Sequence, residues 1–537
     1  MKLNQHDLQY KELWTNKGYE LPAYDRAALA RKTIESPTWL HFGAGNIFRG
    51  FPAAVLQNLL NTGNYDRGLI VAEGYDYEII EKAYRPYDNV SLLVVLKADG
   101  SIEKKVIGSI VSSVTANSAN QSDWGRLVSV FENPTLQMVS FTITEKGYAI
   151  TNGAGEYLPD VAADLTAGPA SPTNIMAKIC ALCYKRYRKN GAPLALVSMD
   201  NCSHNGEKLA AAVNKIAEIW AEKGLVDPAF VDYLKKSGKV SFPWTMIDKI
   251  TPRPDANVKT MLEKDGFEDT DIIITSKKTY TAPFVNAEEA QYLVVEDNFP
   301  NGRPPLEKGG VIFTSRDTVN MVEKMKVCTC LNPLHTALAV FGCLLSYKTI
   351  FEEMRDKDLV RLVEKIGYTE GMPVVVDPKI INPMDFIKEV LEVRFPNPFM
   401  PDTPQRIATD TSQKIPVRYG ETIKAYLARP DLDVTSLEAI PFVLAGWCRY
   451  LLGMNDDGKP FEISPDPRLA EMQSHVKGIS LGEKGPFTNT LKPILSDATI
   501  FGVDLYQVGL AEKVEKYFTE MVAAPGAIRK ALESVSK

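Results

Sequence analysis

Histidine and cysteine are scarce in this chain. It holds only five histidines and seven cysteines among 537 residues, and the cysteines are irregularly spaced. An odd, irregular set is not a disulfide framework, so the sequence predicts free thiols and a reducing, cytoplasmic location. Any imidazole chemistry must fall on one of five positions. These are His6, His41, His204, His335 and His475.

Excess positive charge and long apolar runs are also missing. Lys and Arg number 61 against 67 Asp and Glu, a net charge of −6, which argues against a nucleic-acid or anionic-membrane partner, because both attract basic surfaces. No apolar run reaches the ~18 residues that cross a membrane. The richest run, 336–345, is predicted to be a buried core helix, and the polar start lacks the apolar core of a signal peptide.

The N-terminal half contains a strand, a glycine turn, a helix and a second strand. Residues 38–42 are predicted as a strand, 47–60 as an amphipathic helix and 69–73 as the next strand. This order is a βαβ unit and predicts a parallel sheet. Further expectations are strands over 138–144 and 194–199, and a hairpin of 90–96 with 106–114 inserted in the sheet.

The pattern changes near residue 311, after which helical periodicity dominates apart from one strand-like run near Val374. We therefore predict an α/β dinucleotide-binding domain over 1–312, with a polar arm over 1–36, and a mostly helical domain over 313–537. The region 393–418, rich in Pro, Asn and Asp, is predicted as loop. Helices are expected over 317–325, 333–347, 351–366, 383–395, 419–428, 435–453 and 505–535.

The glycine turn predicts a phosphate-binding loop. Gly43 permits a tight turn, and Gly45 lets the backbone approach a pyrophosphate at the start of the helix. Asn46 and Arg49 offer a donor and a charge. The alternative is an ordinary strand–helix turn. Glu73, at the end of the second strand, is suited to accept hydrogen bonds from ribose hydroxyls and to repel a 2′-phosphate, which favours NAD over NADP; Asp76 is a rival for this role.

A second candidate site lies in Lys326-Val-Cys-Thr-Cys-Leu-Asn332-Pro-Leu-His335. A partly buried lysine can transfer the hydroxyl proton of an alcohol, an amide can hold the oxygen, and an imidazole can orient the hydroxyl. The alternative is that these residues have structural roles only: a solvated lysine, an asparagine that caps the helix and a histidine of the core. Zinc held by Cys328, Cys330 and His335 is a further alternative, but the spacing matches no common zinc pattern, and buried thiols explain these cysteines better.

Six ordered segments resemble the polyol-specific long-chain dehydrogenase/reductase family, also called the mannitol dehydrogenase family, over residues 37–530. They are FGAGNIFRGF (42–51), TITEKGY (142–148), SMDNCSHNG (198–206), MIDKITP (246–252), VVEDNFPNGRPPLE (294–307) and KVCTCLNPLHTALA (326–339). The resemblance implies a Rossmann-type domain, a helical C-terminal domain, an active site in the cleft between them, and metal-independent hydride transfer with NAD.

The resemblance also implies roles for single residues. The catalytic set is Lys326 as general acid/base with Asn201, Asn332 and His335. Substrate positions are Asp248, Arg406 and Lys414. Arg253 departs from the family's pattern, in which many members carry a small or polar residue, and we predict that it also binds substrate. Cofactor positions are Gly43, Gly45, Asn46, Ile47, Glu73, Thr144, Glu145 and Asn201. This chain has one residue more than the family's pattern between Lys326 and Asn332, so we expect a bulge there; Lys324 fits the lysine position worse.

The chain length, Arg253 and the KVCTCLNPLH variant are most similar to the hexuronate branch of the family, which interconverts mannonate and fructuronate or altronate and tagaturonate. A sugar acid needs a cation for its carboxylate, preferably a bidentate one. Candidates are Arg253, Arg406, Lys414 and Arg418, each of which can instead be a surface charge or an ion pair. Oxidation of the neutral polyol mannitol is the main enzymatic alternative, and a non-catalytic sugar or nucleotide sensor is the alternative of another class.

Overall fold

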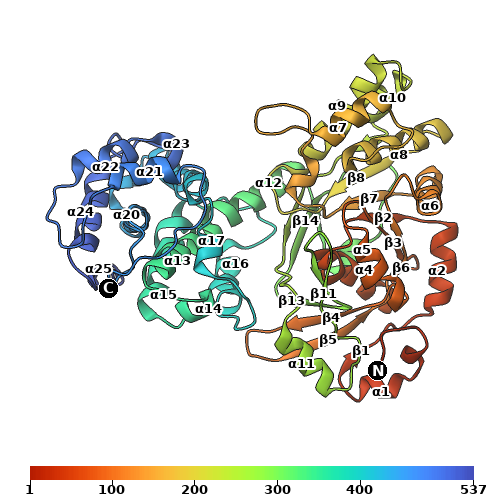
Figure 1. Cartoon of the computed structure of the whole chain (residues 1–537), viewed down its shortest axis with the longest axis horizontal. Helices are drawn as coiled ribbons and strands as arrows, with labels where there is room; N and C mark the ends of the chain where they lie inside the picture. The colour runs from red at the N-terminus through yellow and green to blue at the C-terminus, as the bar shows by residue number, and fades with distance from the viewer. The chain divides into compact units, whose positions relative to one another are not determined.

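The computed structural model describes residues 1–537, which form two compact units. The first contains residues 1–97 and 101–320, and the second contains 98–100 and 321–537. The division falls inside helix α12 (Arg316–Met325), between Asn320 and Met321, whereas the sequence predicted a boundary near residue 312. Figure 1 follows the chain through both units.

A six-stranded sheet forms the centre of the first unit, with the strand order β6-β3-β2-β7-β8-β9. All five neighbouring pairs are parallel. In chain order this is the 3-2-1-4-5-6 arrangement of dinucleotide-binding folds, in which ligands bind where the order reverses, here between β2 and β7. The strands are β2 (Trp39–Phe42), β3 (Leu69–Glu73), β6 (Ile110–Thr115), β7 (Met138–Phe141), β8 (Leu194–Ser198) and β9 (Val240–Ser241).

Helices cover both faces of this sheet. Leu40 and Phe42 of β2 pack with α6 (Gln121–Glu132), α8 (Ile175–Lys189) and α9 (Asn205–Glu222). Trp39 points to the other face, where α2 (Arg26–Glu35), α3 (Asn46–Gly50) and α4 (Pro52–Asn61) pack. Burial on both faces explains why the strands are nearly continuous apolar runs. The helix predicted over 47–60 is two helices, because the chain bends at Phe51, just before a proline at the first position of α4.

The predicted hairpin is partly wrong. Strands β4 (Ser91–Leu96) and β5 (Ile102–Ile107) do form an antiparallel pair. However, they lie in a separate sheet of order β1-β5-β4-β13, with β1 (Tyr19–Glu20) and β13 (Phe284–Glu288), while β6 joins the main sheet. The apolar run 106–114 therefore serves two sheets, divided at Gly108 and Ser109, and a period-two pattern does not mark that division.

Smaller elements complete the first unit. A three-stranded sheet contains β10 (Thr245–Asp248), β14 (Tyr292–Glu296) and β15 (Ile312–Thr314), and a two-stranded one contains β11 (Ile273–Ile274) and β12 (Tyr280–Thr281). The remaining helices are α1 (Lys11–Thr15), α5 (Glu78–Ala83), α7 (Pro159–Ala167), α10 (Ala229–Lys235) and α11 (Ala256–Lys264). The N-terminal arm is tied down by β1 and by the Met1 ammonium, which pairs with Glu268 at 2.9 Å.

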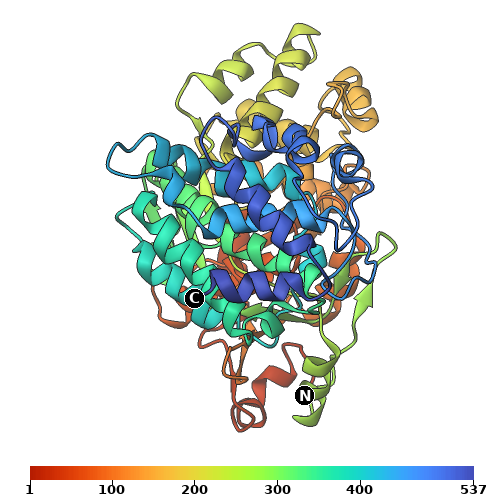
Figure 2. The same ribbon diagram turned by 90° about the vertical axis from the view of Figure 1, so that its left-hand side faces the viewer.

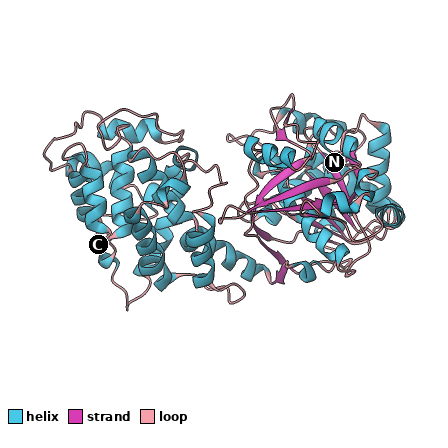
Figure 3. Cartoon of the chain, turned by 90° about the horizontal axis from the view of Figure 1, so that it is seen from below, coloured by secondary structure: helices cyan, strands magenta, loops and turns pink.

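The second unit is helical, as the sequence predicted; Figures 2 and 3 show its helices, and every strand belongs to the first unit. Its helices are α13 (Asn332–Leu344), α14 (Ile350–Glu353), α15 (Lys357–Glu364), α16 (Pro383–Glu389), α17 (Pro404–Ile407), α18 (Thr411–Ile415), α19 (Glu421–Leu427), α20 (Ala439–Tyr450), α21 (Leu469–Val476), α22 (Thr488–Leu495), α23 (Ala498–Phe501), α24 (Ala511–Val522) and α25 (Ala527–Val535). Four π-helical turns, at Lys326–Cys330, Lys365–Gly371, Val390–Arg394 and Pro416–Gly420, extend helices in this unit.

Two predictions for this unit are wrong. The strand-like run near Val374 is a 3₁₀ turn, Met372–Val374. The predicted loop 393–418 contains α17, α18 and most of a π-helical turn. Both helices are too short to show an apolar period, and their proline and aspartate stand at helix starts, where these residue types are favoured.

Helix α12, the π-helical turn after it and α13 form one continuous segment, Arg316–Leu344. By length and composition this segment could cross a membrane, but 72% of its most apolar window is buried in the protein. Every residue from Thr336 to Leu344 is buried. These properties are those of a core helix, as predicted for 336–345.

Candidate functional site

The glycine turn follows β2, beside the point where the strand order reverses. Gly43 has φ +104°, and a Cβ placed there would lie 2.1 Å from the carbonyl oxygen of Thr142, so only glycine fits. A Cβ placed on Gly45 meets no atom within 4 Å. The open space at Gly45, at the start of α3, suits the close backbone approach of a phosphate group.

Arg49 does not have the role that the sequence suggested. The side chain is completely buried, and its guanidinium donates to the carbonyl of Ala282 at 2.7 Å and to Thr281 Oγ1 at 2.8 Å. It also donates to Asn46 Oδ1 at 3.0 Å. Arg49 therefore fixes α3 to the β12–β13 segment and orients the Asn46 amide, and it is not available to a phosphate.

Glu73 shapes the turn from the end of β3. Its Oε2 accepts the Ala44 N–H at 2.8 Å, and its Oε1 accepts the N–H groups of Tyr75 at 2.8 Å and Asp76 at 3.1 Å. Burial raises the pKa of this carboxyl, while the three N–H groups act in the opposite direction. The rival Asp76 is also buried, and it accepts from Thr275 Oγ1 at 2.5 Å. Sequence reasoning missed the link that Glu73 makes between two loops; the ribose contact remains a prediction.

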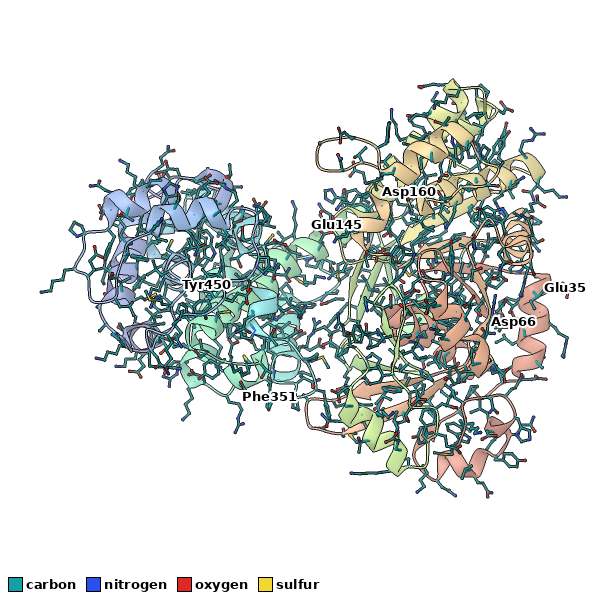
Figure 4. The ribbon with its side chains drawn as sticks, viewed as in Figure 1. Glu35, Asp66, Glu145, Asp160, Phe351 and Tyr450 are labelled. Atoms are coloured by element: carbon teal, nitrogen blue, oxygen red, sulfur yellow. The ribbon has the colours of Figure 1, made fainter.

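A pocket of about 260 Å³ lies at the carboxyl ends of β7 and β8. It contains four of the predicted cofactor or catalytic residues, Ile47, Thr144, Glu145 and Asn201. Figure 4 labels Glu145, just after β7. The other lining residues are Met199, Asp200, Ile247 and Lys249. Residues from four separate segments thus meet at the edge of the sheet where dinucleotide-binding folds hold their ligands.

Asp200 holds this edge together. Its two carboxylate oxygens accept the N–H groups of Ile143 and Thr144, both at 2.9 Å, and the Tyr148 hydroxyl at 2.6 Å. These bonds keep Thr144 at φ +65°, an uncommon value for a residue with a side chain. Burial raises the pKa of Asp200, opposed by its hydrogen bonds. The sequence analysis assigned no role to Asp200, although its position directly after the strand predicted over 194–199 was an available signal.

Two predicted substrate residues of the first unit lie beyond the main sheet. Asp248 ends β10 and is buried. Arg253 is exposed, and its guanidinium lies over the Tyr280 ring, 4.2 Å from the centroid. His41, in contrast, is fully buried in β2 between Ser140 and Thr142, and burial lowers its pKa to about 3. It is a structural histidine.

In the second unit, Lys326 begins the π-helical turn Lys326–Cys330. The Leu331 N–H donates to the Lys326 carbonyl at 3.1 Å, a bond that spans five residues. A π-helical turn accommodates one extra residue without ending the helix, so the bulge expected before Asn332 is present. Lys326 is buried, whereas Lys324 is exposed.

Asn332 and His335 share the first turn of α13. The His335 ring packs against Phe395, with centroids 5.1 Å apart, and its Nε2 lies 3.6 Å from Asp402 Oδ2. Burial, together with the charges of four cations, lowers the pKa of His335 to about 3. These cations are Arg418, Arg406, Arg394 and Lys414. At neutral pH the imidazole is therefore uncharged.

The predicted residues Arg406 and Lys414 thus belong to one cationic cluster with Arg394 and Arg418. Arg406 is exposed and pairs with Asp402. Lys414 Nζ donates to the carbonyl oxygens of Ile407, at 2.9 Å, and Thr409. Burial lowers the pKa of Lys414 to about 8, and the Arg418 charge contributes. Arg394, in a π-helical turn, carried no sequence signal.

Cys328, Cys330 and His335 do not form a metal-ligating group; no three or more His, Cys, Asp or Glu side chains in the chain are so arranged. The Cys330 thiol is buried and donates to the Pro383 carbonyl at 3.7 Å. Burial raises the pKa of Cys328 to about 11 and that of Cys330 to about 12. Both are protonated thiols at neutral pH.

Residues 37–308 match the Mannitol dehydrogenase Rossmann domain, and residues 318–522 match the Mannitol dehydrogenase C-terminal domain. The chain belongs to the mannitol dehydrogenase family. The prediction of family and fold class is thereby confirmed. The two matched regions correspond to the two units of the structure, a Rossmann domain followed by a helical domain.

The similarity to other members of the family extends over all or nearly all of the chain. The D-mannonate oxidoreductase of Thermotoga maritima is 52% identical over 537 residues, covering 100% of this chain and 99% of the relative. The mannitol 2-dehydrogenase of Neosartorya fischeri is 29% identical, covering 94% and 93%. Among solved structures, the Pseudomonas fluorescens mannitol 2-dehydrogenase ternary complex with NAD and D-mannitol matches with a TM-score of 0.71 at 27% identity, covering 99% of both chains.

Proposed function

We propose that the protein is an NAD-dependent oxidoreductase that interconverts D-mannonate and D-fructuronate. The observation that carries this proposal is the 52% identity over the full length to a D-mannonate oxidoreductase, against 29% to a mannitol 2-dehydrogenase. The cationic cluster around His335 supports it independently, because a sugar acid carries a negative charge and mannitol does not. The free thiols support a cytoplasmic location as part of the same proposal.

The first unit has the features that NAD requires. The Gly43–Gly45 turn allows close approach of a pyrophosphate, and the pocket with Ile47, Thr144 and Glu145 lies at the carboxyl edge of the parallel sheet. NAD, when bound, accepts the hydride from the alcohol carbon or returns it to the ketone. We assign Glu73 to the adenosine ribose, where a carboxylate disfavours the 2′-phosphate of NADP.

Proton transfer falls to Lys326 in this proposal. Oxidation of an alcohol releases a hydride and a proton, and the proton needs a base. His335 is poorly suited to be that base, because an imidazole with a pKa of about 3 has little affinity for the proton that it would have to take. Lys326 is the buried lysine of the same helical segment. It takes the hydroxyl proton during oxidation and returns it during reduction.

The remaining catalytic residues hold the reacting oxygen. The amides of Asn201 and Asn332 stabilise negative charge on that oxygen, and neutral His335 forms a hydrogen bond with the hydroxyl. Asp248, Arg253, Arg406 and Lys414 bind the rest of the substrate.

A substrate panel tests this proposal. D-mannonate, D-altronate, D-mannitol, D-arabinitol and mannitol phosphate are each offered with NAD and with NADP, and the formation of reduced cofactor is followed. We expect the highest kcat/KM for D-mannonate with NAD. A preference for D-altronate or mannitol would assign the enzyme to another branch of the family, and no turnover with any substrate would favour a sensor.

A further inference from the structure

Arg418 is a desolvated cation without an acidic partner. It lies in the π-helical turn Pro416–Gly420, and burial lowers its pKa to about 10. Its Nη1 donates to Thr336 Oγ1 and, at 3.4 Å, to the Asn332 carbonyl. Its Nε and Nη2 form no hydrogen bond, and the side chain remains partly accessible. Desolvated charges in proteins are usually paired, so this unused edge requires an explanation.

The neighbours of Arg418 do not neutralise it. The Asp402 carboxylate, which lies 3.6 Å from His335 Nε2, already pairs with Arg406. Lys414 is itself bonded only to carbonyl oxygens. Asp410 and Asp466 act on Lys414, and Asp466 accepts from the N–H and hydroxyl of Ser412. Arg418 and Lys414 repel each other in a poorly solvated region, an arrangement typical of functional sites.

We propose that the Nε–Nη2 edge of Arg418 binds the substrate carboxylate and selects sugar acids over neutral polyols. Two parallel N–H groups match the two oxygens of a carboxylate, which gives geometric specificity as well as charge. Lys414 adds a second positive charge. This inference rests on the proposed function, because only a sugar-acid substrate brings the carboxylate.

Arg418 fits this role better than the other candidate arginines. Arg406 already has a carboxylate partner and is exposed. Arg253 stacks on Tyr280 and is exposed as well. Arg418 alone among these three combines desolvation, an open hydrogen-bonding edge and contact with the turn that carries Asn332 and His335. In mannonate the carboxylate is at the opposite end from the carbinol that becomes the ketone, so Arg418 acts in binding and not in proton transfer.

Two variants separate charge from geometry. Arg418→Met removes the charge at similar length, and Arg418→Lys keeps the charge but loses the paired N–H groups. We measure kcat/KM for D-mannonate and for D-mannitol with saturating NAD. We expect the mannonate-to-mannitol ratio to fall about 10- to 100-fold in Arg418→Met, the usual effect of losing a hydrogen bond to a charged group, mainly through KM for mannonate. Arg418→Lys should give a mannonate-to-mannitol ratio between those of the wild type and Arg418→Met. It also provides the test if Arg418→Met does not fold.

Thr336→Val is the matched control, since it removes the hydrogen bond from Arg418 to Thr336 Oγ1 but keeps the guanidinium and its bond to the Asn332 carbonyl. We expect it to keep the wild-type ratio. An equal loss on both substrates in the Arg418 variants, or a ratio that falls as far in Thr336→Val, would overturn the carboxylate role. Wild-type enzyme that oxidises mannitol but not mannonate would overturn the proposed function and this role together; normal mannonate turnover with an unchanged ratio in Arg418→Met would overturn only this role.

Discussion

The predicted cofactor site of the first unit and the cationic cluster of the second unit differ in how their charged groups are bonded. In the first unit, Glu73 and Asp200 each accept three hydrogen bonds from the protein itself. In the second unit, Arg418 has an open edge, and Lys414 is held only by carbonyl oxygens. In our proposal, the first pattern fixes the backbone at the cofactor site, and the second leaves charge available to a substrate. Buried charge is costly unless it is paired, so the second pattern indicates a charged ligand.

The largest effect is expected at the proton-transferring lysine. Lys326→Ala should lower kcat by about 10²–10⁴-fold, because positioned acid/base catalysis contributes that much, while NADH binding, measured by fluorescence titration, stays nearly unchanged. Alcohol oxidation by the wild type should rise with pH through one ionisation, which the variant lacks. Lys324→Ala is the matched control, two positions away and exposed. Wild-type kcat in Lys326→Ala together with loss in Lys324→Ala would assign the role to Lys324.

Asp200→Asn tests whether the first unit depends on its internal pairing. The new amide group presents N–H donors where Ile143 or Thr144 already donates. At least one hydrogen bond to a charged group is therefore lost, and such a bond contributes about 1.5–3 kcal/mol. We expect weaker NADH binding and a kcat/KM lower by about 10-fold or more, in line with that cost. Tyr148→Phe removes only one of the bonds and should have a smaller effect. Unchanged NADH affinity in Asp200→Asn would show that the hydrogen bonds of Asp200 do not support the cofactor site.

Glu73→Ser addresses cofactor choice. The loss of the carboxylate removes repulsion of a 2′-phosphate and also three hydrogen bonds to the loops at residues 44 and 75–76. The ratio of kcat/KM for NAD to that for NADP should narrow, and the KM for NAD should rise at the same time. If this ratio falls while the KM for NAD stays unchanged, the glycine turn does not need Glu73. If the ratio does not fall, Asp76 is the residue that disfavours NADP.

The smallest effect concerns stability. Glu353 is fully buried in the second unit, and neither carboxyl oxygen has a hydrogen-bond partner. Burial raises its pKa well above the usual value, with Asp356 and Glu352 adding repulsion. A group whose pKa is raised by folding contributes stability that is complete below its unfolded pKa of ~4.3 and is lost as the pH rises toward the folded pKa.

Glu353→Gln removes this ionisation. The stability of the variant should depend less on pH above ~4.3, with the difference from wild type growing by up to about 1.4 kcal/mol per pH unit until the folded pKa is reached. Thermal unfolding between pH 5 and 8 measures the two slopes. If the stability of the wild type and of Glu353→Gln changed equally with pH, Glu353 would not be a buried carboxyl that is neutral in the folded protein.

The sequence predicted correctly those features that depend on residues close together in the chain. Strand β3 matches its predicted range, and Gly43 lies where the turn required glycine. The extra residue before Asn332 appears as a π-helical turn. Partners distant in sequence were not predictable: Arg49 bonds to residues 281 and 282, and Asp200 to residues 143, 144 and 148. The short helices α17 and α18 were missed because they are too brief for periodicity.

Direct identification of the product tests the central claim, which is NAD-linked interconversion of D-mannonate and D-fructuronate. The protein is incubated with D-fructuronate and NADH, NADH loss is followed by absorbance, and the sugar acid formed is identified by NMR. We predict one D-mannonate formed for each NADH oxidised, with NADPH a much poorer donor. Formation of the other epimer, or oxidation of NADH only with a neutral ketose such as fructose, would contradict the account.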